Sequence, residues 1–416
     1  MHPPEFFAII ADGLRNGAWL TRRRVLEYTV LLFVFECIAI VFFAAGSHGL
    51  IVPLEHANPS DFISFYAAGS LAGDGTPALA YDMDAHYRAE QAVAGEGISY
   101  NYFYYPPVCL MLCALFAKLP YLPALYAFEL LTLALYLTTA RRIAGEHDRG
   151  VLLLLLAFPA VFWNFGMGQN AFLSASLFGA GMLLLDRRPV LAGIFLGALC
   201  YKPHFGLLVP IALAAGGHWR SFVSAGSTVL ALIGASLVLH GLDTWQAFLQ
   251  AAASSDSVYA SDHIFVGGYA SPFGLVLSLG GARPLAYAVQ VAVSLAAALW
   301  VGIVFARRQS LPVRAATLLS ATIVAIPIIQ FYGLMLGVVA MIFLVRAGRA
   351  NGFPPFAKTL LALLFVLPLV SGNLAFATPT LAAPLFAAGL FALTIAAARQ
   401  EIARKPAIGK MAAAAV

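Results

Sequence analysis

The sequence predicts an all-α integral membrane protein, a polytopic bundle of about 11 to 13 helical spans. Of the 416 residues, 61% are hydrophobic and only 10% are charged, whereas a soluble domain carries about a quarter charged residues. The apolar residues form runs long enough to cross a bilayer, which takes about 20 residues per helix. Because the bilayer core offers no water, the backbone must pair internally, and helices satisfy this requirement.

Short basic loops indicate the domain organisation and the orientation. Groups of Arg residues separate apolar runs at 22–24, 141–142, 187–188 and 307–308. Such loops are typical of the cytoplasmic side of a membrane. We therefore expect a cytoplasmic N-terminal segment (1–24), one polytopic transmembrane domain (25–400) and a cytoplasmic or disordered tail (401–416). The net charge of +5 is spread over these loops rather than gathered in a groove, so the expected partners include membrane lipids but no nucleic acid.

Two long polar interruptions, at about 46–103 and 241–283, are the predicted outer loops. With a cytoplasmic N-terminus, both lie on the periplasmic side of the membrane. A conflict follows the first loop: if 104–119 and 121–140 both cross the membrane, the Arg pair after them lies outside, against the charge rule. One of these two segments is therefore expected to be a partial or surface helix.

The first outer loop contains the stretch NPSDFISFYAAGSLAGDGTPALAYD (58–82). Pro59 and Ser60, directly before Asp61, predict a helix start. The following residues, to Leu71, predict a short amphipathic helix along the membrane surface, which GDGTP ends. An acid at the lipid boundary, held on an aromatic helix, is a suitable general base with a raised pKa. The alternative is a carboxylate that only caps the helix.

Two further motifs interrupt apolar runs. YNYFYYPPVCLML (100–112) is typical of an interfacial aromatic belt followed by a proline-initiated helix, which needs no function. WNFGMGQNAFL (163–173) breaks a pair of apolar runs at its glycines. Its Gln169 and Asn170 are candidates for hydrogen bonds to a sugar, or they satisfy free backbone groups at the break.

The stretch LCYKPHFGLLVP (199–210) places Lys202 and a His on either side of a Pro inside an apolar run. Ionisable residues at membrane depth cost several kcal/mol and usually face a cavity or a partner. Lys202 is therefore a functional candidate, and its compact charge suits a phosphate group. Snorkelling of the side chain to the interface is the alternative. Later in the chain, IPIIQFYGLML (326–336) breaks another run with Gln330 and Tyr332, a weaker pair of candidates.

In this order, the motifs resemble those of the GT-C membrane glycosyltransferases, and in particular glycosyltransferase family 87, the bacterial polyprenyl-phosphate-dependent mannosyltransferase group. The resemblance spans roughly residues 25–350 and rests on DFISFY at 61–66, YD at 81–82, YYPP at 104–107, GMGQN at 166–170 and KP at 202–203. The chain departs from the family near the outer end of a late span, where QFYG (330–333) stands in place of an acidic or His element.

The resemblance implies a GT-C-type fold and an inverting transfer of a mannose-like hexose from a polyprenyl-phosphate donor to a lipid or glycan acceptor. The reaction would occur at the outer face of the bacterial cytoplasmic membrane. Asp61 would be the general base, and Lys202 would balance the charge of the leaving phosphate with help from Tyr105 or His204. The residues expected to bind substrate are Tyr66, Asp82, Gln169, Asn170, Gln330 and Tyr332.

A transporter or flippase of a lipid-linked sugar is the main alternative. It would use the intramembrane residues Glu36, Glu129 and Lys202 as relays and should show two related halves, which are not visible in the sequence. A non-catalytic assembly partner, with Asp61 as a helix cap only, is the other alternative. The chain has no GxxxxGK[ST] phosphate loop, so a soluble nucleotide-sugar donor is not suggested.

The cysteines and the acidic residues of the sequence indicate whether a metal or another cofactor is required. The four cysteines lie in apolar runs without the spacing of a disulfide framework or of a metal site. Asp61, Asp82 and Asp84 share one loop, which leaves a divalent metal possible. However, a monophosphate leaving group needs less charge neutralisation than a diphosphate, and we expect no required metal or other cofactor.

Overall fold

The computed structural model describes residues 3–46, 51–53, 57–146, 148–259, 268–371 and 381–413. The described chain is helical apart from one small antiparallel hairpin, in which β1 (Ile51–Pro53) pairs with β2 (Ala57–Pro59). The prediction of a polytopic helical membrane protein is confirmed.

Six helical segments in the described residues are long and apolar enough to cross a membrane, judged by length and composition. These segments belong to α2 (Arg22–Gly46), α6 (Tyr121–Ala144), α12 (Trp219–Tyr259), α14 (Arg283–Ala306), η5 (Phe331–Leu334) continued by α16 (Met335–Asn351), and α18 (Ala382–Ala413). A seventh span results if α7 (Arg149–Leu156) and α8 (Pro159–Met167), which are bent by 55° at their junction, count as one.

The prediction of 11 to 13 spans is higher because many apolar runs are divided into shorter helices. A helix of ten residues is about 15 Å long, which is half the thickness of the hydrocarbon core. The shorter apolar helices are α3 (Phe62–Gly73), α5 (Pro107–Phe116), α9 (Ala171–Leu184), α10 (Pro189–Ala198), α11 (Val209–Ala215), α15 (Leu311–Ala325) and α17 (Ala357–Val366). The remaining short elements are α1 (Pro3–Asn16), η1 (Pro77–Tyr81), α4 (Met83–Ala94), η2 (Leu199–Tyr201), η3 (Pro203–Gly206), α13 (Pro272–Ser278) and η6 (Leu367–Val370).

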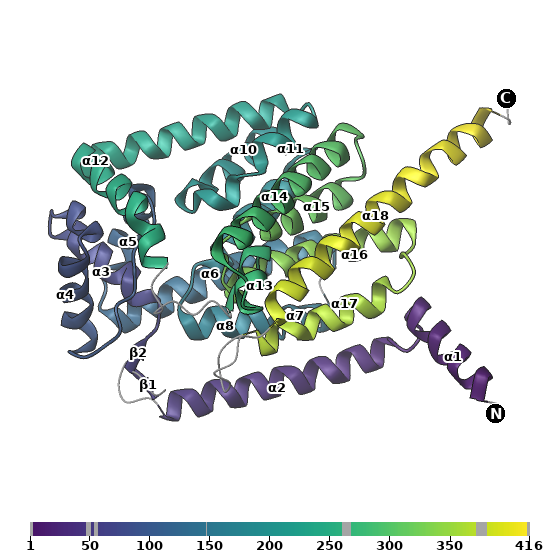
Figure 1. The fold of residues 1–416 in the computed structure, drawn as a ribbon, viewed down its shortest axis with the longest axis horizontal. Coiled ribbons are helices and arrows are strands. Elements are labelled where there is room, and N and C mark those ends of the chain that lie inside the picture. Colours follow the sequence, from purple (N-terminus) through teal and green to yellow (C-terminus); the bar gives the residue numbers. More distant parts are fainter. Residues whose placement is uncertain are drawn as a thin grey trace.

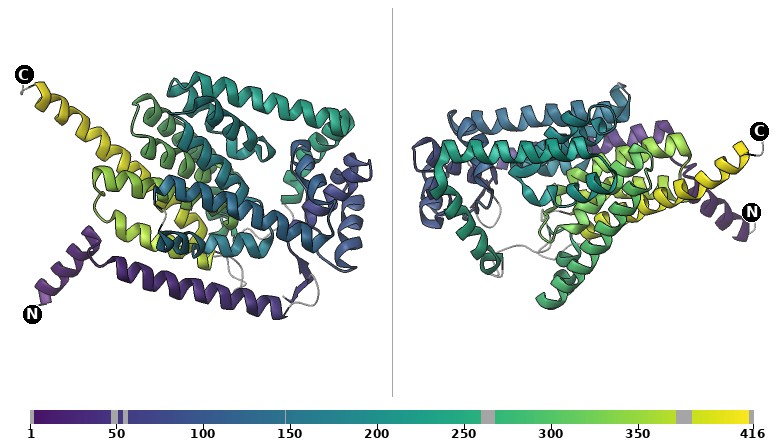
Figure 2. Two further views of the ribbon diagram at one scale, coloured as in Figure 1. Left: turned by 180° about the vertical axis from the view of Figure 1, so that it is seen from behind. Right: turned by 90° about the horizontal axis from the view of Figure 1, so that it is seen from above.

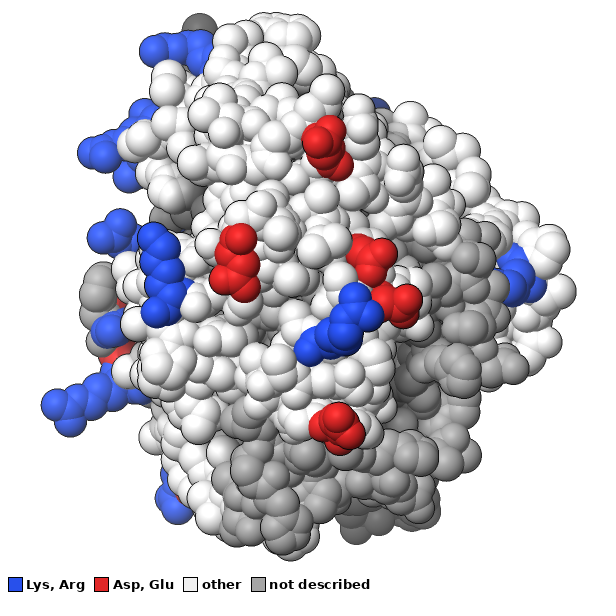
Figure 3. All heavy atoms as spheres, turned by 90° about the vertical axis from the view of Figure 1, so that its left-hand side faces the viewer, with Lys and Arg blue, Asp and Glu red and all other residues white. Residues whose placement is uncertain are grey.

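The two ends of the bundle differ (Figure 1). The N-terminal helix α1 and the last turns of α18 lie at one end, while β1, β2, α3 and α4 lie at the other, and Figure 2 shows the same separation from behind. Because α2 runs from the first end to the second, the first predicted outer loop is at the end away from both termini. Figure 3 looks onto this end: most of the face is uncharged, with scattered Asp and Glu, while Lys and Arg project mainly along one edge.

The centre of the bundle is formed by α9, α15 and α16. Every residue of α15 from Val313 to Ala325 is buried, and α9 packs against α6, α10 and α16. A second hydrophobic cluster joins α3 to α5 around Phe62 and Leu110. Leu177 of α9 packs against this cluster and also against the larger hydrophobic cluster at the centre of the bundle. α9 therefore connects the centre of the bundle to the first loop.

The structure corrects several local expectations. α5 is too short to cross a membrane, whereas α6 is long enough, so 104–119 is the partial segment that the charge rule required. α3 is not exposed along its length, because Phe62 and its neighbours are buried and α3 packs tightly on α5; its place along the membrane surface stays a prediction. A Cβ added at Gly69 would lie 2.3 Å from the carbonyl oxygen of Cys113. α18 continues to Ala413 inside the predicted tail, since alanine has the highest helix propensity.

The second predicted outer loop, 241–283, is partly helical. α12 breaks at Gly241, where φ is 80° and ψ is 168°, and then continues to Tyr259; α13 follows later in the same loop. Residues 260–267, with the loop's Asp262 and His263, lie outside the described residues, as do 47–50 and 54–56 of the first loop.

Candidate active site at five helix ends

Asp61 directly precedes α3. Among the described residues, no backbone N–H group of this helix donates to the side chain of Asp61. Its Oδ2 instead accepts a 2.6 Å hydrogen bond from Nε2 of Gln169. The backbone N–H of Asp61 donates to the carbonyl oxygen of Met167 over 2.8 Å. The junction between α8 and α9 therefore holds Asp61 by both its backbone and its carboxylate, and the capping interpretation is wrong.

The surroundings of Asp61 raise the pKa of its carboxyl from 3.8 to about 6. Burial is the largest cause because a low dielectric disfavours the charged form, and the hydrogen bond from Gln169 and the charge of Lys202 lower the pKa in part. A carboxyl with this pKa is mostly ionised at neutral pH and is more basic than an ordinary aspartate. Part of the residue's surface is nevertheless exposed.

The close approach of Asp61 to the α8–α9 junction depends on Gly168. This residue has φ +66°, in the left-handed region that favours glycine. A Cβ at this position would lie 2.8 Å from Cβ of Phe62 and 3.0 Å from Oγ of Ser60. The glycine in the GMGQN motif thus allows α9 to begin directly beside the start of α3.

Lys202 lies at the break between η2 and η3, where Pro203 interrupts the apolar run. Its side chain is 94% buried, since its exposed fraction is 6%. The ammonium donates to Oδ1 of Asn170 over 3.0 Å. Snorkelling is therefore the wrong interpretation of this lysine, because its charge points into the protein toward the α8–α9 junction.

Three aromatic rings surround the ammonium of Lys202. Its Nζ lies 5.5 Å from the ring centroid of Tyr105, 4.9 Å from that of Phe205 and 5.6 Å from that of Tyr332. Ring faces attract a cation, more strongly when water is absent. The rings therefore stabilise a charged Lys202 in a site with little water.

All of these groups lie at helix ends: before α3, before α5, between α8 and α9, between η2 and η3, and in η5. Irregular backbone at membrane depth is tolerated only where it is buried in protein or lines a cavity. Tyr201, which was not predicted from the sequence, also contacts this group. Its hydroxyl lies 2.5 Å from Oγ of Ser174 and donates to the carbonyl oxygen of Asn170 over 3.2 Å. The only signal for it was its place beside the Lys-Pro motif.

Two predicted residues of the first loop have structural partners outside this group. The hydroxyl of Tyr66 donates to the carbonyl oxygen of Leu119. Asp82 is exposed and caps α4 by accepting from the backbone N–H of Ala85 over 2.8 Å. Both side chains therefore have structural partners, and their contact with a substrate stays a prediction.

His204 and Gln330, which the sequence predicts to bind the donor phosphate and the substrate, lie at the edge of this group of helix ends. His204 is exposed, and its ring packs on Phe205. Gln330 forms an isolated antiparallel bridge with Tyr269, which brings the end of the second outer loop beside η5. Tyr332, two residues on, faces Lys202.

Behind α3, α4 carries a buried His86–Glu90 pair that the sequence presents only as polar loop residues. Both side chains have no exposed surface, and Nδ1 of His86 lies 3.7 Å from Oε1 of Glu90. Burial raises the pKa of Glu90 to about 8 and lowers that of His86 to about 4, so both groups are mainly neutral near pH 7. Nε2 of His86 contacts the carbonyl oxygen of Ser64 in α3.

A small, mainly apolar pocket adjoins the group of helix ends. Its lining includes Phe62, Phe65 and Phe128, together with Asn170 and Tyr201 of the group described above. The pocket therefore places an apolar surface directly beside the polar α8–α9 junction.

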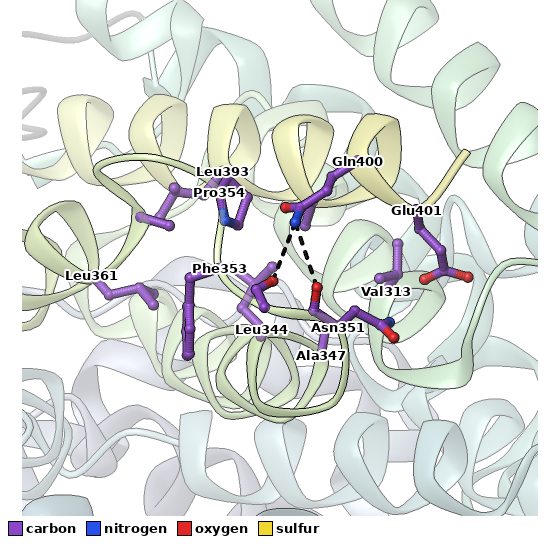
Figure 4. Close-up of a pocket in the computed structure, with 14 residues that line it drawn as sticks. Val313, Leu344, Ala347, Asn351, Phe353, Pro354, Leu361, Leu393, Gln400 and Glu401 are labelled. Carbon is purple, nitrogen blue, oxygen red and sulfur yellow. Dashed lines mark hydrogen bonds between the residues drawn. The ribbon is translucent and has the colours of Figure 1, made fainter. Parts of the chain in front are cut away.

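A second pocket lies at the C-terminal end of α16, around Asn351 (Figure 4), whereas Tyr332 precedes the other end of this helix. Gln400 of α18 reaches across the pocket toward the carbonyl oxygens of Asn351 and Gly352. Its lining contains none of the residues predicted to bind substrate, so it is separate from the candidate site.

Metal binding finds no obvious place in the described part of the chain. No three His, Cys, Asp or Glu side chains there come together in a way that could hold a metal ion. Whether the reaction requires a metal stays a prediction from the sequence.

A sequence model of glycosyltransferase family 87 matches residues 103–330. The matched part contains Tyr105, Gln169, Asn170, Lys202 and Gln330, whereas Asp61 precedes it. No curated protein and no solved structure gives a significant match to the chain.

Proposed function

The chain belongs to glycosyltransferase family 87, and we propose that it moves a mannose-like hexose from a polyprenyl-phosphate donor to a lipid or glycan acceptor, with inversion. The reaction takes place at the outer face of the bacterial cytoplasmic membrane. Asp61 is the general base, and Lys202 stabilises the leaving phosphate.

The observation that carries the proposal is the pairing of an acid and a cation through one helix junction. Asp61 is held by Gln169, and Lys202 is held by the next residue, Asn170. Neighbouring residues of one rigid junction thus fix a proton acceptor and a positive charge close together. Sugar transfer from a phosphate needs both, because a proton leaves the acceptor while negative charge develops on the phosphate.

The chemical step follows from this arrangement. The acceptor hydroxyl gives its proton to the carboxylate of Asp61 as its oxygen attacks the anomeric carbon. The bond between that carbon and the phosphate oxygen breaks, and the polyprenyl phosphate leaves with the bonding electron pair. Lys202 balances the charge on that phosphate. Attack opposite the leaving group inverts the anomeric centre.

The surroundings of Lys202 support a lipid-linked donor. A lysine binds phosphate as a compact point charge, and the three rings around it keep the site poor in water. The neighbouring pocket is lined mainly by apolar side chains, so a donor whose phosphate lies at Lys202 has an apolar surface beside it for its hydrocarbon chain.

The orientation is supported by the placement of the loops. Both termini lie at one end of the bundle, and the start of α3, with Asp61, is near the other (Figure 1). Because the Arg-rich start of α2 is expected inside the cell, the opposite end faces the periplasm. A reporter fused after residue 90 should accordingly lie on the periplasmic side, and cytoplasmic activity of the reporter would reverse this orientation.

The experiment uses the purified full-length protein in lipid vesicles. Polyprenyl-phosphate [¹⁴C]mannose, or GDP-[¹⁴C]mannose in a parallel sample, is mixed with lipids and glycans extracted from a strain that lacks the gene. We expect labelled product only from the lipid-linked donor. Labelled product from the nucleotide sugar alone, or movement of the donor across the vesicle membrane with no new product, contradicts the proposal.

A further inference from the structure

Asn164, in the last turns of α8, organises the junction that holds Asp61 and Lys202. Its carbonyl oxygen accepts from the backbone N–H of Gln169 over 3.1 Å, and its Nδ2 donates to the carbonyl oxygen of Gln169 over 2.8 Å. Its Oδ1 accepts from the backbone N–H of Ala171 over 2.9 Å. One side chain thus fixes the backbone on both sides of Asn170.

Glu129, near the middle of the spanning helix α6, extends this network away from the site. Its Oε2 accepts a 3.3 Å hydrogen bond from the same Nδ2 of Asn164. Glu129 is 1% exposed, and its Oε1 has no partner in the described part of the chain. A buried carboxyl at this depth is energetically costly, and the hydrogen bond to Asn164 links it to the site.

We propose that Glu129 and Asn164 are positioning residues that hold Gln169 against Asp61. The proposal rests on the proposed role of Asp61 as general base. Glu129 touches no substrate in this account and acts through three hydrogen bonds in series: Glu129 to Asn164, Asn164 to Gln169, and Gln169 to Asp61.

The two ends of the Asn164 carboxamide have different partners. Its NH₂ end must face Gln169 and its oxygen end must face Ala171, because the first offers a carbonyl and the second an N–H group. The Gln169 carbonyl and the Ala171 N–H already favour the observed orientation, because the reversed amide would set acceptor against acceptor and donor against donor. The acceptor oxygen of Glu129 beside Nδ2 adds a third contact that favours the same orientation. Its loss therefore weakens the hold of the Asn164 side chain on the junction.

Loosening of the junction should raise the pKa of the Asp61 carboxyl. The hydrogen bond from Gln169 lowers the pKa of this carboxyl, so weakening it moves the proton uptake of Asp61 to higher pH. Lys202, Glu90 and Tyr121 are the other titratable groups whose charge acts on Asp61. Glu90 and Tyr121 bond to residues outside this network. Lys202 is held by Asn170, and because its charge lowers the pKa of Asp61, a looser junction raises this pKa further. Misplacement of a catalytic group by about 1 Å can cost about 10²-fold in rate.

The first test compares Glu129→Leu with Glu129→Gln. The glutamine keeps an acceptor oxygen for Asn164 and should retain kcat within about threefold of wild type. The leucine should lower kcat by about 10-fold to 10²-fold with little change in the KM for the lipid-linked donor, and should raise the apparent pKa of the rate. Glu36→Leu is the matched control, because Glu36 is another buried glutamate of a spanning helix and has no place in this network.

The second test does not depend on sugar transfer. Dicyclohexylcarbodiimide reacts with protonated carboxyls, so the pH dependence of its adduct on Asp61, located by peptide mass spectrometry, reports the titration of that residue. Glu129→Leu should shift the labelling midpoint to higher pH, while Glu129→Gln and Glu36→Leu should leave it in place. If wild-type protein transfers no sugar, the proposed function fails, yet this midpoint still decides the positioning role. Identical midpoints and identical kcat for Glu129→Leu and wild type overturn the inference.

Discussion

Asp61 and Lys202 are fixed by two consecutive residues of the chain. Gln169 donates to Oδ2 of the aspartate, and Oδ1 of Asn170 accepts from the ammonium of the lysine. One helix junction therefore sets the relation between an acid that precedes it by about a hundred residues and a cation that follows it by about thirty.

Replacing Asp61 with asparagine should reduce sugar transfer by about 10²-fold or more, which is the range that a general base supplies. The amide oxygen can still accept the hydrogen bond from Gln169, so the fold should be retained. Transfer from the lipid-linked donor is measured with purified protein, and thermal unfolding in detergent serves as the control. Activity equal to wild type would show that Asp61 is not the base.

Activity should increase with pH through the pKa of Asp61, which lies at about 6, because only the ionised carboxylate accepts a proton. Below this pH, kcat/KM should fall about tenfold per pH unit. Gln169→Leu removes a hydrogen bond that lowers this pKa, so the midpoint should move to higher pH. A profile from pH 4.5 to 8.5 for both proteins checks this, and an unchanged midpoint would contradict the role of Gln169.

Lys202→Met should lower transfer by about 10²-fold, because it removes the positive charge that balances the leaving phosphate. The matched control is Lys118→Met: Lys118 is exposed and lies in the turn before α6, so its loss should change transfer by less than about twofold. Saturation kinetics with the lipid-linked donor measure both. Equal activities of the two variants would remove Lys202 from the mechanism.

The sequence predicted most residues of the candidate site, but not the hydrogen bonds that hold these residues in place. The sequence made Asp61, Gln169, Asn170, Lys202 and Tyr332 separate candidates, and the resemblance to glycosyltransferase family 87 implied that they act together. The structure brings them together at helix ends. That they act in catalysis stays a prediction.

The supporting contacts were not predictable because they join polar groups of distant segments, which leave no periodic pattern. Glu129 could be recognised as buried, but not its bond to Asn164. His86 and Glu90 looked like ordinary polar residues of a loop. Span number was overestimated because hydropathy does not show where a Pro or Gly divides one apolar run into two short helices.

Glu90→Gln should reduce the dependence of stability on pH. The pKa of Glu90 is raised from 4.5 to about 8 by burial, so the folded protein keeps a proton that the unfolded chain has released. This contribution is fully present below about pH 4.5 and is lost as the pH rises toward 8 and beyond. His86, whose pKa is lowered, acts in the opposite sense only below about pH 6.5. Between pH 6.5 and 8.5, wild type should therefore lose stability, by up to a few kcal/mol.

The measurement is the Tm in detergent at intervals across this range. The glutamine variant, which can still accept from the backbone N–H of Asn101, should show a flatter curve. Glu96→Gln is the control, since this glutamate of the same loop is exposed and its loss should leave the wild-type slope intact. Parallel curves for Glu90→Gln and wild type would show that burial does not hold a proton on this residue.

Gly168→Ala should impair both stability and transfer, because two independent costs meet at this position. The residue has φ +66°, which costs a non-glycine residue roughly 1 kcal/mol. The new Cβ would also lie 2.8 Å from Cβ of Phe62, and this atom is fixed close to the backbone and cannot swing away as a flexible side-chain end could. The start of α3 must therefore move away from the junction, which draws Asp61 away from Gln169.

Gly166→Ala provides the comparison within the same motif. Gly166 is exposed in α8, and a Cβ there would meet no atom within 4 Å, so alanine should be neutral or slightly stabilising. We expect Gly168→Ala to lower Tm and to reduce kcat by about tenfold or more, while Gly166→Ala keeps both. If the two variants behave alike, the close packing of the α8–α9 junction on α3 does not set the position of Asp61, and the two sides of the site are held together in another way.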